Sequence, residues 1–256
     1  MAPIETPATI LSTIPYGETS KIARLATREL GVVSVIAKGA RRPRSAFGAS
    51  LQILSDGIAT VHLARHSDLH TLSAFDVGRV PEALATNIER YAVATVLGEL
   101  MLRFAPGDRQ AATYDFFRHG LDVLEGVPAE VVAIVGLRSI WGLVAHLGFA
   151  PALGVCARDG LPVGRDQGPV AFSPAHGGVL CAACARAVET SRLTPKDLRD
   201  LEALIEGRGD LPALDSRYLA AHRRLLDRYV RYHLGDGAAL PALGFWSEPG
   251  WVQAPG

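Results

Sequence analysis

The segment Val32–Gly48 (VVSVIAKGARRPRSAFG) joins an apolar run to a basic loop. β-Branched residues fill its first half, and Gly, Pro and Ser separate the cations of its second half. These cations are Lys38, Arg41, Arg42 and Arg44. A strand that ends in such a loop can present cations to a phosphate backbone, and Phe47 adds an aromatic face on which a base could stack. The pattern indicates nucleic-acid binding; the alternative is a solvated turn with several arginines.

A second group of residues has the types and spacing of a metal site. Cys181 and Cys184 form a CxxC pair, and two thiolates on a tight turn suit one side of a tetrahedral zinc site. Upstream, Cys156 is followed by Asp159 where a second CxxC pair would have a cysteine. The spacing is compatible with zinc held by the three cysteines and either Asp159 or His176. It is also compatible with a knuckle that folds without metal, and no surrounding strand–helix–strand pattern favours a redox pair.

Four arginines are spaced along the last predicted helix. Arg217, Arg224, Arg228 and Arg231 are separated by seven, four and three residues, which places them on one helix face. The opposite face is predicted to be an apolar stripe made of Tyr218, Ala221, Leu225, Tyr229 and Tyr232. The row indicates a basic strip for phosphates or for an acidic tail of a protein partner. The alternative is a solvated outer face, partly neutralised by Asp227.

Catalytic signatures are missing from the sequence. It contains no GxxxxGK[ST], GxGxxG, HExxH or GxSxG motif, and its eight histidines are scattered. Nothing positive therefore argues for an enzyme, and the sequence predicts a binding protein.

The composition restricts how such a protein can attract nucleic acid. The 256 residues carry a formal net charge of zero, so any affinity for polyanions must come from local patches. Through Val80 the basic residues outnumber the acidic ones. The start MAPIETPA shows no signal peptide, and three cysteines do not make a disulfide framework, which favours the reducing cytoplasm. The most apolar window, Val127–Ala150, contains Arg138 near its middle and is predicted to be a buried helix.

Short strands and then helices must position these groups. Glycine-punctuated β segments are expected at Ala8–Pro15, Lys21–Thr27, Val32–Lys38, Ile58–Ala64 and Leu69–Phe75. Five strands in about seventy residues suit a small barrel, although Lys21–Thr27 also fits a helical period. After Pro81 the period becomes helical. Helices are expected from Glu82, from Asp108, over Ala129–Leu147, from a capping box at Thr194-Pro195, and from Asp215-Ser216 to Leu234.

The order of these features resembles the RecO family of bacterial recombination and repair mediators. YGETSKIARLATRELGVVSVIAKGARRPRSAFGASLQ resembles the N-terminal signature of that family. LGFAPALGVC and FSPAHGGVLCAAC resemble its cysteine-bearing region, and LDRYVRYHLG resembles its closing helix. The resemblance covers nearly the whole chain.

The resemblance implies an α+β multidomain fold. An N-terminal OB-fold at residues 1–80 would bind DNA, and a helical domain would occupy residues 81–148 and 186–240. A zinc-finger-like insertion would span residues 149–185. The sequence itself predicts a flexible tail at residues 241–256, with docking of Phe245 and Trp246 as the alternative. The commoner metal pattern of the family is two CxxC pairs, from which Asp159 departs.

The resemblance also implies a function and its partners. Proteins of this family are non-enzymatic mediators of DNA repair and homologous recombination in the RecF pathway, in the cytoplasm at the nucleoid. They bind single- and double-stranded DNA, anneal complementary strands, engage the acidic tail of the single-strand-binding protein, and with RecR help to load RecA. The alternatives are a protein-only adaptor of a repair complex and a metal-dependent nucleic-acid enzyme.

By the same match, particular residues are expected to contact DNA. Lys38, Arg41, Arg42 and Arg44 are the expected phosphate contacts. Lys21, Arg24 and Arg65 are further candidates, unless they lie on the far face of the barrel. Arg217, Arg224, Arg228 and Arg231 are the expected contacts of the partner tail.

Overall fold

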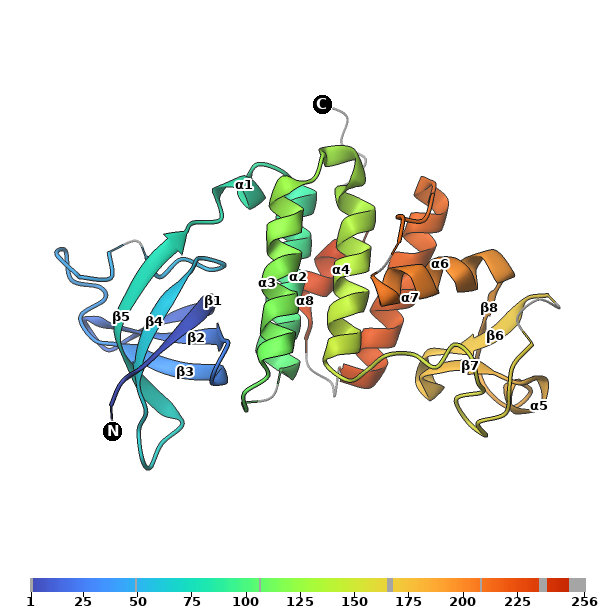
Figure 1. The fold of residues 1–256 in the computed structure, drawn as a ribbon, viewed down its shortest axis with the longest axis horizontal. Helices are drawn as coiled ribbons and strands as arrows, with labels where there is room; N and C mark the ends of the chain where they lie inside the picture. The colour runs from blue at the N-terminus through green and yellow to red at the C-terminus, as the bar shows by residue number, and fades with distance from the viewer. Residues whose placement is uncertain are drawn as a thin grey trace. The chain divides into compact units, whose positions relative to one another are not determined.

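The computed structural model describes residues 2–48, 50–105, 107–164, 168–207, 209–234 and 239–248. The chain forms two compact units, Met1–Glu125 and Gly126–Gly256. Figure 1 shows a strand barrel followed by helices in the first unit, and helices with a small sheet in the second. The predicted α+β class, with a front barrel and a helical remainder, is confirmed.

The barrel consists of five strands that close on themselves. They are β1 (Ile4–Tyr16), β2 (Ser20–Thr27), β3 (Gly31–Ala37), β4 (Asp56–His62) and β5 (Leu69–Arg79). The order is β1-β2-β3-β5-β4, and β1 also pairs with β4, which closes the barrel. The ambiguous segment Lys21–Thr27 is therefore a strand. Only the β3–β5 pair is parallel among these neighbours.

The barrel core follows from the alternation of side chains along each strand. Its centre is made of buried aliphatic residues such as Ile10, Leu25, Val35 and Val61. The long connection between β3 and β4 adds Ala40, Phe47 and Leu51 to the same core. This connection therefore folds back onto the barrel instead of running free over its surface.

Helices complete the first unit. They are α1 (Glu82–Ala85), α2 (Ile88–Phe104) and α3 (Ala111–Gly126). The sequence predicts one helix from Glu82, but Asn87 accepts a hydrogen bond from the backbone N–H of Arg90 and begins a separate helix. Buried Leu54 has a φ of 66° and lies against Gly98 of α2, where an added Cβ would meet its side chain at 3.4 Å.

The second unit is built around a buried helix. Its elements are η1 (Ala129–Val131), α4 (Val132–His146), β6 (Val170–Ser173), η2 (Pro174–His176), β7 (Gly178–Leu180), α5 (Ala182–Ala185), β8 (Ser191–Leu193), α6 (Pro195–Glu206), α7 (Ser216–Leu234) and α8 (Pro241–Ser247). The sheet has the order β7-β6-β8. Ala129–His146 is long and apolar enough to cross a membrane, but 56% of it is buried within the protein, as is typical of a core helix. The predicted capping box at Thr194 and Asp197 is confirmed.

The last described helix corrects an expectation. Residues 241–256 are expected to form a flexible tail, yet α8 occupies Pro241–Ser247 and buries Leu243 and Trp246. The guanidinium of Arg223 lies 4.9 Å from the centre of the Trp246 ring, so docking of a large indole beside a cation fixes this segment. Residues 249–256 lie outside the described residues. The boundary between the two units follows Glu125 rather than residue 80, and the expected division into domains stays a prediction.

Candidate nucleic-acid interface, metal group and basic cavity

The basic loop after β3 is a chain of tight turns. Backbone N–H groups of Arg42, Ser45 and Gly48 donate to the carbonyl oxygens three residues before them, at 3.0 to 3.1 Å. Phe47 is only 6% exposed and packs in the barrel core. The predicted stacking of a base on Phe47 is therefore wrong, because the ring anchors the loop to the barrel. The turns and the buried ring hold the loop in place.

The cations of this loop point to solvent. Lys38, Arg41, Arg42 and Arg44 are exposed. The backbone N–H of Arg41 donates to the carbonyl of Thr19 at 2.8 Å, which attaches the loop to the turn between β1 and β2. Within the part of the chain that the structure describes, no carboxylate forms an ion pair with these four side chains. Their charge is therefore available to an outside anion.

Other basic residues of the N-terminal part are neutralised within the first unit. Nε and Nη2 of Arg28 lie 2.8 and 3.0 Å from the two carboxylate oxygens of Asp115 on α3. This hydrogen bond lowers the pKa of Asp115. Arg79 pairs with Glu125 at 2.9 Å and also contacts Asp122. The local excess of positive charge that the sequence shows is thus concentrated in the loop.

The outer face of β1 and β2 lies beside this loop. Tyr16, Ile14 and Ser12 of β1 are opposite Ser20, Ile22 and Arg24 of β2, and these positions alternate with the buried Ala23 and Leu25. Tyr16 is 52% and Ile14 57% exposed. The strand expected at Ala8–Pro15 stops before Tyr16, so the sequence analysis did not identify Tyr16 as an exposed aromatic side chain. The signal that could have found it is the alternation along β1, which gives Tyr16 the same outward direction as Ile14.

The pairing register of the strands places the three remaining DNA-binding candidates at different levels along the barrel. Arg24 lies opposite Ser34 on the same outer face as Tyr16, and Lys21 lies opposite Ala37, next to Lys38. Arg65 belongs to the connection between β4 and β5. Because β5 runs parallel to β3 with Leu69 opposite Ser34, this connection lies toward the start of β3, away from the basic loop. The structure therefore brings Lys21 next to the loop, whereas Arg24 lies level with Ser34 in the middle of β3 and Arg65 lies toward the opposite end of the barrel.

Three cysteines and one aspartate converge in the second unit. The ligand atoms of Cys156, Asp159, Cys181 and Cys184 all lie within 4.8 Å of one another. The Sγ atoms of Cys181 and Cys184 lie 3.2 and 3.1 Å from Oδ2 of Asp159. A zinc–sulfur bond of about 2.3 Å places two ligands of a tetrahedral site about 3.8 Å apart. The separations in the group, from 3.1 Å to at most 4.8 Å, lie on both sides of this value, so a zinc-sized cation fits after small shifts of the side chains.

The surrounding backbone positions this group. Ala157 donates to Val179 of β7 at 2.8 Å, which brings the upstream segment beside the strand that leads to Cys181. A Cβ added to Gly178 would lie 2.2 Å from the carbonyl oxygen of Ala152, so this approach requires glycine. His176 is the wrong choice of fourth ligand, because its Nδ1 lies 3.1 Å from Oγ of Ser173 and it is not part of the group.

The electrostatics of the group favour a cation. The backbone N–H of Leu161 and the cysteine thiols donate to Asp159 and hold the pKa of its carboxyl well below its usual range. The hydrogen bond from Cys184 to this carboxylate raises the pKa of the thiol to about 12. Without metal, the thiol protons of Cys181 and Cys184 therefore lie between the sulfur atoms and the Asp159 carboxylate. A bound metal ion would displace these protons.

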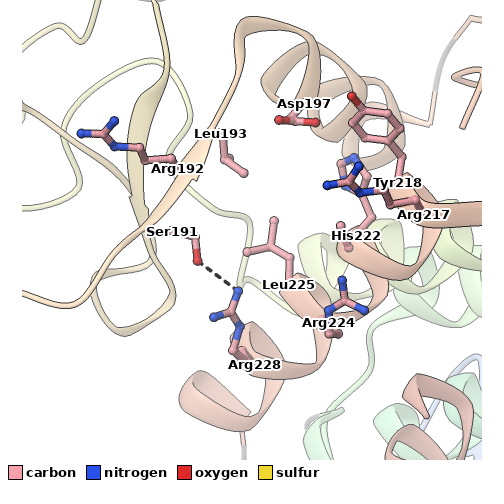
Figure 2. A pocket seen from close by; sticks show the side chains of 11 residues that line it. Ser191, Arg192, Leu193, Asp197, Arg217, Tyr218, His222, Arg224, Leu225 and Arg228 are labelled. Atoms are coloured by element: carbon pink, nitrogen blue, oxygen red, sulfur yellow. Dashed lines mark hydrogen bonds between the residues drawn. The ribbon is translucent and has the colours of Figure 1, made fainter. Parts of the chain in front are cut away.

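The arginine row of α7 lines a cavity of about 380 Å³. Arg217, Arg224 and Arg228 line it from α7, and Arg192 borders it on β8 with its guanidinium directed away from the other lining side chains (Figure 2). Arg228 donates to Oγ of Ser191 at 3.0 Å. The fourth member, Arg231, pairs with Asp227 at 2.8 Å and lines a separate cavity of about 310 Å³. The structure therefore brings three of the four arginines together.

The predicted apolar stripe of α7 is partly wrong. Leu225 and Tyr229 are buried as expected, but Tyr218, Ala221 and Tyr232 are exposed. The buried face is made of His222, Arg223, Leu225, Leu226, Tyr229, Val230 and Leu234. Arg223 is buried because it packs over Trp246 of α8, a helix that the sequence reading treats as a tail.

Comparison with known proteins identifies the family. The model described as recombination protein O N terminal matches residues 1–79, and the model described as recombination protein O C terminal matches residues 85–239. A protein of Anaeromyxobacter dehalogenans named DNA repair protein RecO is 34% identical over 234 residues, covering 88% of this chain and 89% of that protein. The protein of the same name from Symbiobacterium thermophilum is 31% identical over 223 residues, covering 84% and 86%. This chain therefore belongs to the RecO family of DNA repair proteins.

Proposed function

We propose that the protein binds single- and double-stranded DNA with its barrel and anneals complementary strands. The observation that carries this proposal is the exposed basic loop, whose four cations lack described carboxylate partners, beside the exposed ring of Tyr16. Lys38, Arg41, Arg42 and Arg44 are the proposed phosphate contacts. Lys21 and Arg24 extend this surface, and Arg65 is a more distant candidate.

The proposed mechanism is electrostatic. Cations on the barrel neutralise phosphates of two strands, lower their mutual repulsion and so favour pairing. Because the contacts go to the backbone, sequence preference is slight. The protein itself makes and breaks no covalent bond in this mechanism, so it acts as a mediator and not as an enzyme.

The second unit supplies the proposed partner contact. Arg217, Arg224 and Arg228 surround a cavity whose walls also include Leu193 and Leu225. A cavity that combines cations with apolar walls suits an acidic peptide that carries apolar side chains. We assign this cavity to the acidic tail of the single-strand-binding protein, with Arg231 at its margin. With RecR, this contact helps to load RecA onto DNA that the single-strand-binding protein covers, at the nucleoid in the cytoplasm.

Zinc is the proposed occupant of the cysteine group. Cys156, Cys181, Cys184 and Asp159 would hold it, and it would fix the fold of the insertion without taking part in a reaction. In the same proposal residues 1–80 form the DNA-binding domain, residues 81–148 and 186–240 the helical domain, and residues 149–185 the insertion. The family matches, which end at residue 79 and resume at residue 85, support the first boundary.

A strand-annealing assay tests this function. Two complementary oligonucleotides with donor and acceptor dyes should pair faster with the wild-type protein than alone. The triple variant R41A/R42A/R44A should lose this acceleration, and R28A, which removes a cation already paired with Asp115, should keep it. Absence of DNA retention at moderate salt in the wild type would instead favour a protein-only adaptor.

A further inference from the structure

The cavity beside α7 contains a histidine that the proposed function leaves unused. His222 is 3% exposed and lines the cavity together with Arg217, Tyr218 and Arg224 (Figure 2). Neither of its ring nitrogens has a hydrogen-bond partner among the described residues. A buried imidazole with both nitrogens unpaired is costly, since buried polar groups in native proteins are normally satisfied. Its position in a cation-lined cavity points to a ligand that supplies the missing partner.

An exposed tyrosine neighbours this histidine at the cavity. Tyr218 precedes His222 by one helical turn, so the two side chains are neighbours on α7. Tyr218 is 40% exposed. Both residues line the cavity, so the wall around the imidazole includes an exposed aromatic side chain.

The charges around the imidazole come from three elements. Arg192 of β8 and Arg217, Arg224 and Arg228 of α7 line the cavity as cations. The charged groups of α6 that act on the ring are Lys196, Asp197 and Asp200; the helix also carries Arg199, Glu202 and Glu206. Lys196 and Asp200 pair with each other at 2.6 Å, and Asp197 is occupied by the capping box with Thr194. The cavity is therefore positive overall, and its own acids are already engaged.

This environment keeps the free imidazole neutral. Burial lowers the pKa of His222; Lys196 acts in the same direction, and Asp200 and Asp197 oppose it. A negative charge brought by a ligand would favour the protonated imidazole over the neutral one, because an opposite charge next to the ring stabilises its protonated form.

We propose that His222 completes a carboxylate site with Arg217, Arg224 and Arg228, and that it takes up a proton when an acidic peptide enters the cavity. This inference rests on the proposed function, in which the cavity receives an acidic tail. A peptide carboxylate is favoured over a DNA phosphate because Leu193, Leu225 and Tyr218 form apolar walls that suit side chains. His222 is thus a specificity residue for the charge of the ligand.

The inference predicts a pH-dependent affinity. Uptake of one proton tightens binding by at most about tenfold per pH unit, so the peptide should bind about three- to tenfold more tightly at pH 6 than at pH 8. Peptide carboxylates titrate near pH 4, outside this window.

The experiment uses the full chain and a labelled peptide with the last ten residues of the single-strand-binding protein. Calorimetry at pH 7 in two buffers with different ionisation enthalpies counts the protons taken up on binding. We expect net uptake with the wild type and none with H222Q, whose affinity should be lower than that of the wild type at pH 6 and should no longer depend on pH between 6 and 8. H233Q is the matched control, since His233 contacts the Pro174 carbonyl and does not line this cavity, and it should keep the pH dependence.

The outcomes separate the two proposals. Tight peptide binding by the wild type without proton uptake, and with equal affinity at pH 6 and pH 8, overturns the role of His222 and leaves the tail contact standing. Undiminished binding by R224E, or no binding at any pH, removes the tail from this cavity and the inference with it. If H222Q does not fold, the calorimetry of the wild type and an NMR titration of the His222 ring with and without peptide decide. Displacement of the peptide by a DNA duplex with the same proton uptake would replace the carboxylate by a phosphate and overturn the inference.

Discussion

The guanidinium of Arg41 donates a hydrogen bond to the carbonyl oxygen of Gly17, with 3.0 Å between Nη1 and the oxygen. Together with the backbone bond from Arg41 to Thr19, it attaches the basic loop to the turn between β1 and β2. Tyr16 directly precedes this turn. One loop and one turn therefore present cations and an exposed aromatic ring at the same end of the barrel.

Removal of the three loop arginines should weaken DNA binding and its salt dependence together. On single strands each lost phosphate contact reduces the slope of log affinity against log salt by about 0.7, so R41A/R42A/R44A should flatten it by up to about 2. Fluorescence anisotropy with a labelled oligonucleotide at several salt concentrations measures the slope. R28A is the control and should leave it unchanged. An unchanged slope in the triple variant would exclude this loop as the DNA contact.

Replacement of the exposed tyrosine should weaken binding of single strands without changing the salt slope. Stacking of one base on an aromatic ring contributes about 1–3 kcal/mol, so Y16S should lower the affinity for single-stranded DNA about fivefold or more. Affinity for a duplex, whose bases are already stacked, should change little. Y91S removes another exposed tyrosine, on α2, and serves as the control. Equal losses on duplex and single strand would argue against stacking.

Metal analysis of the purified protein should find about one zinc per chain, held by the three thiolates and Asp159. C181S should lose the metal and lower the thermal stability of the second unit. D159C should retain zinc and release it more slowly to a chromogenic chelator, since a fourth thiolate is a softer ligand than a carboxylate. Protein that lacks zinc after preparation with added metal, and that unfolds at the same temperature as C181S, would show that the group is a metal-free knuckle.

Alkaline stability should report on the burial of Tyr229. Burial raises the pKa of Tyr229 to about 12, whereas its unfolded value is near 10. The folded state thus keeps a proton that the unfolded state loses, and this contribution is complete below pH 10 and declines as the pH rises from 10 to 12. The free energy of unfolding should fall by at most about 1.4 kcal/mol per pH unit from this group. Y229F should show a shallower fall in denaturant titrations, and Y232F, at an exposed position, should match the wild type.

Local sequence patterns predicted the strands and the helix starts, because these depend on alternation and on caps within a few residues. The strand expected at Val32–Lys38, which is found at Gly31–Ala37, and the capping box at Thr194 are examples. Lys21–Thr27, which also fits a helical period, is a strand because it pairs with both β1 and β3. The pattern did not predict the direction of Phe47. Whether an aromatic residue in a Gly/Pro/Ser loop faces solvent or the core depends on how a long connection folds back, and that is decided by the space left in the barrel.

The buried face of α7 shows the same limit of local patterns. Its sequence offers two stripes of similar apolarity, and Tyr218 and Tyr232 were assigned inward because they are aromatic. The stripe that is buried instead contains His222 and Arg223. Arg223 is covered by Trp246, which lies in another helix, so the choice between the two stripes depends on a contact that no local period reveals.

Closure of the barrel also limits how other polypeptides can join this chain. Each of its five described strands is hydrogen-bonded on both sides, so none of them can accept an extra strand from a partner. In the sheet β7-β6-β8 the outer side of β8 is unpaired among the described strands, and its residues Ser191, Arg192 and Leu193 line the arginine cavity. A peptide that binds by β-augmentation would therefore do so along β8, with its main chain beside the cations of α7.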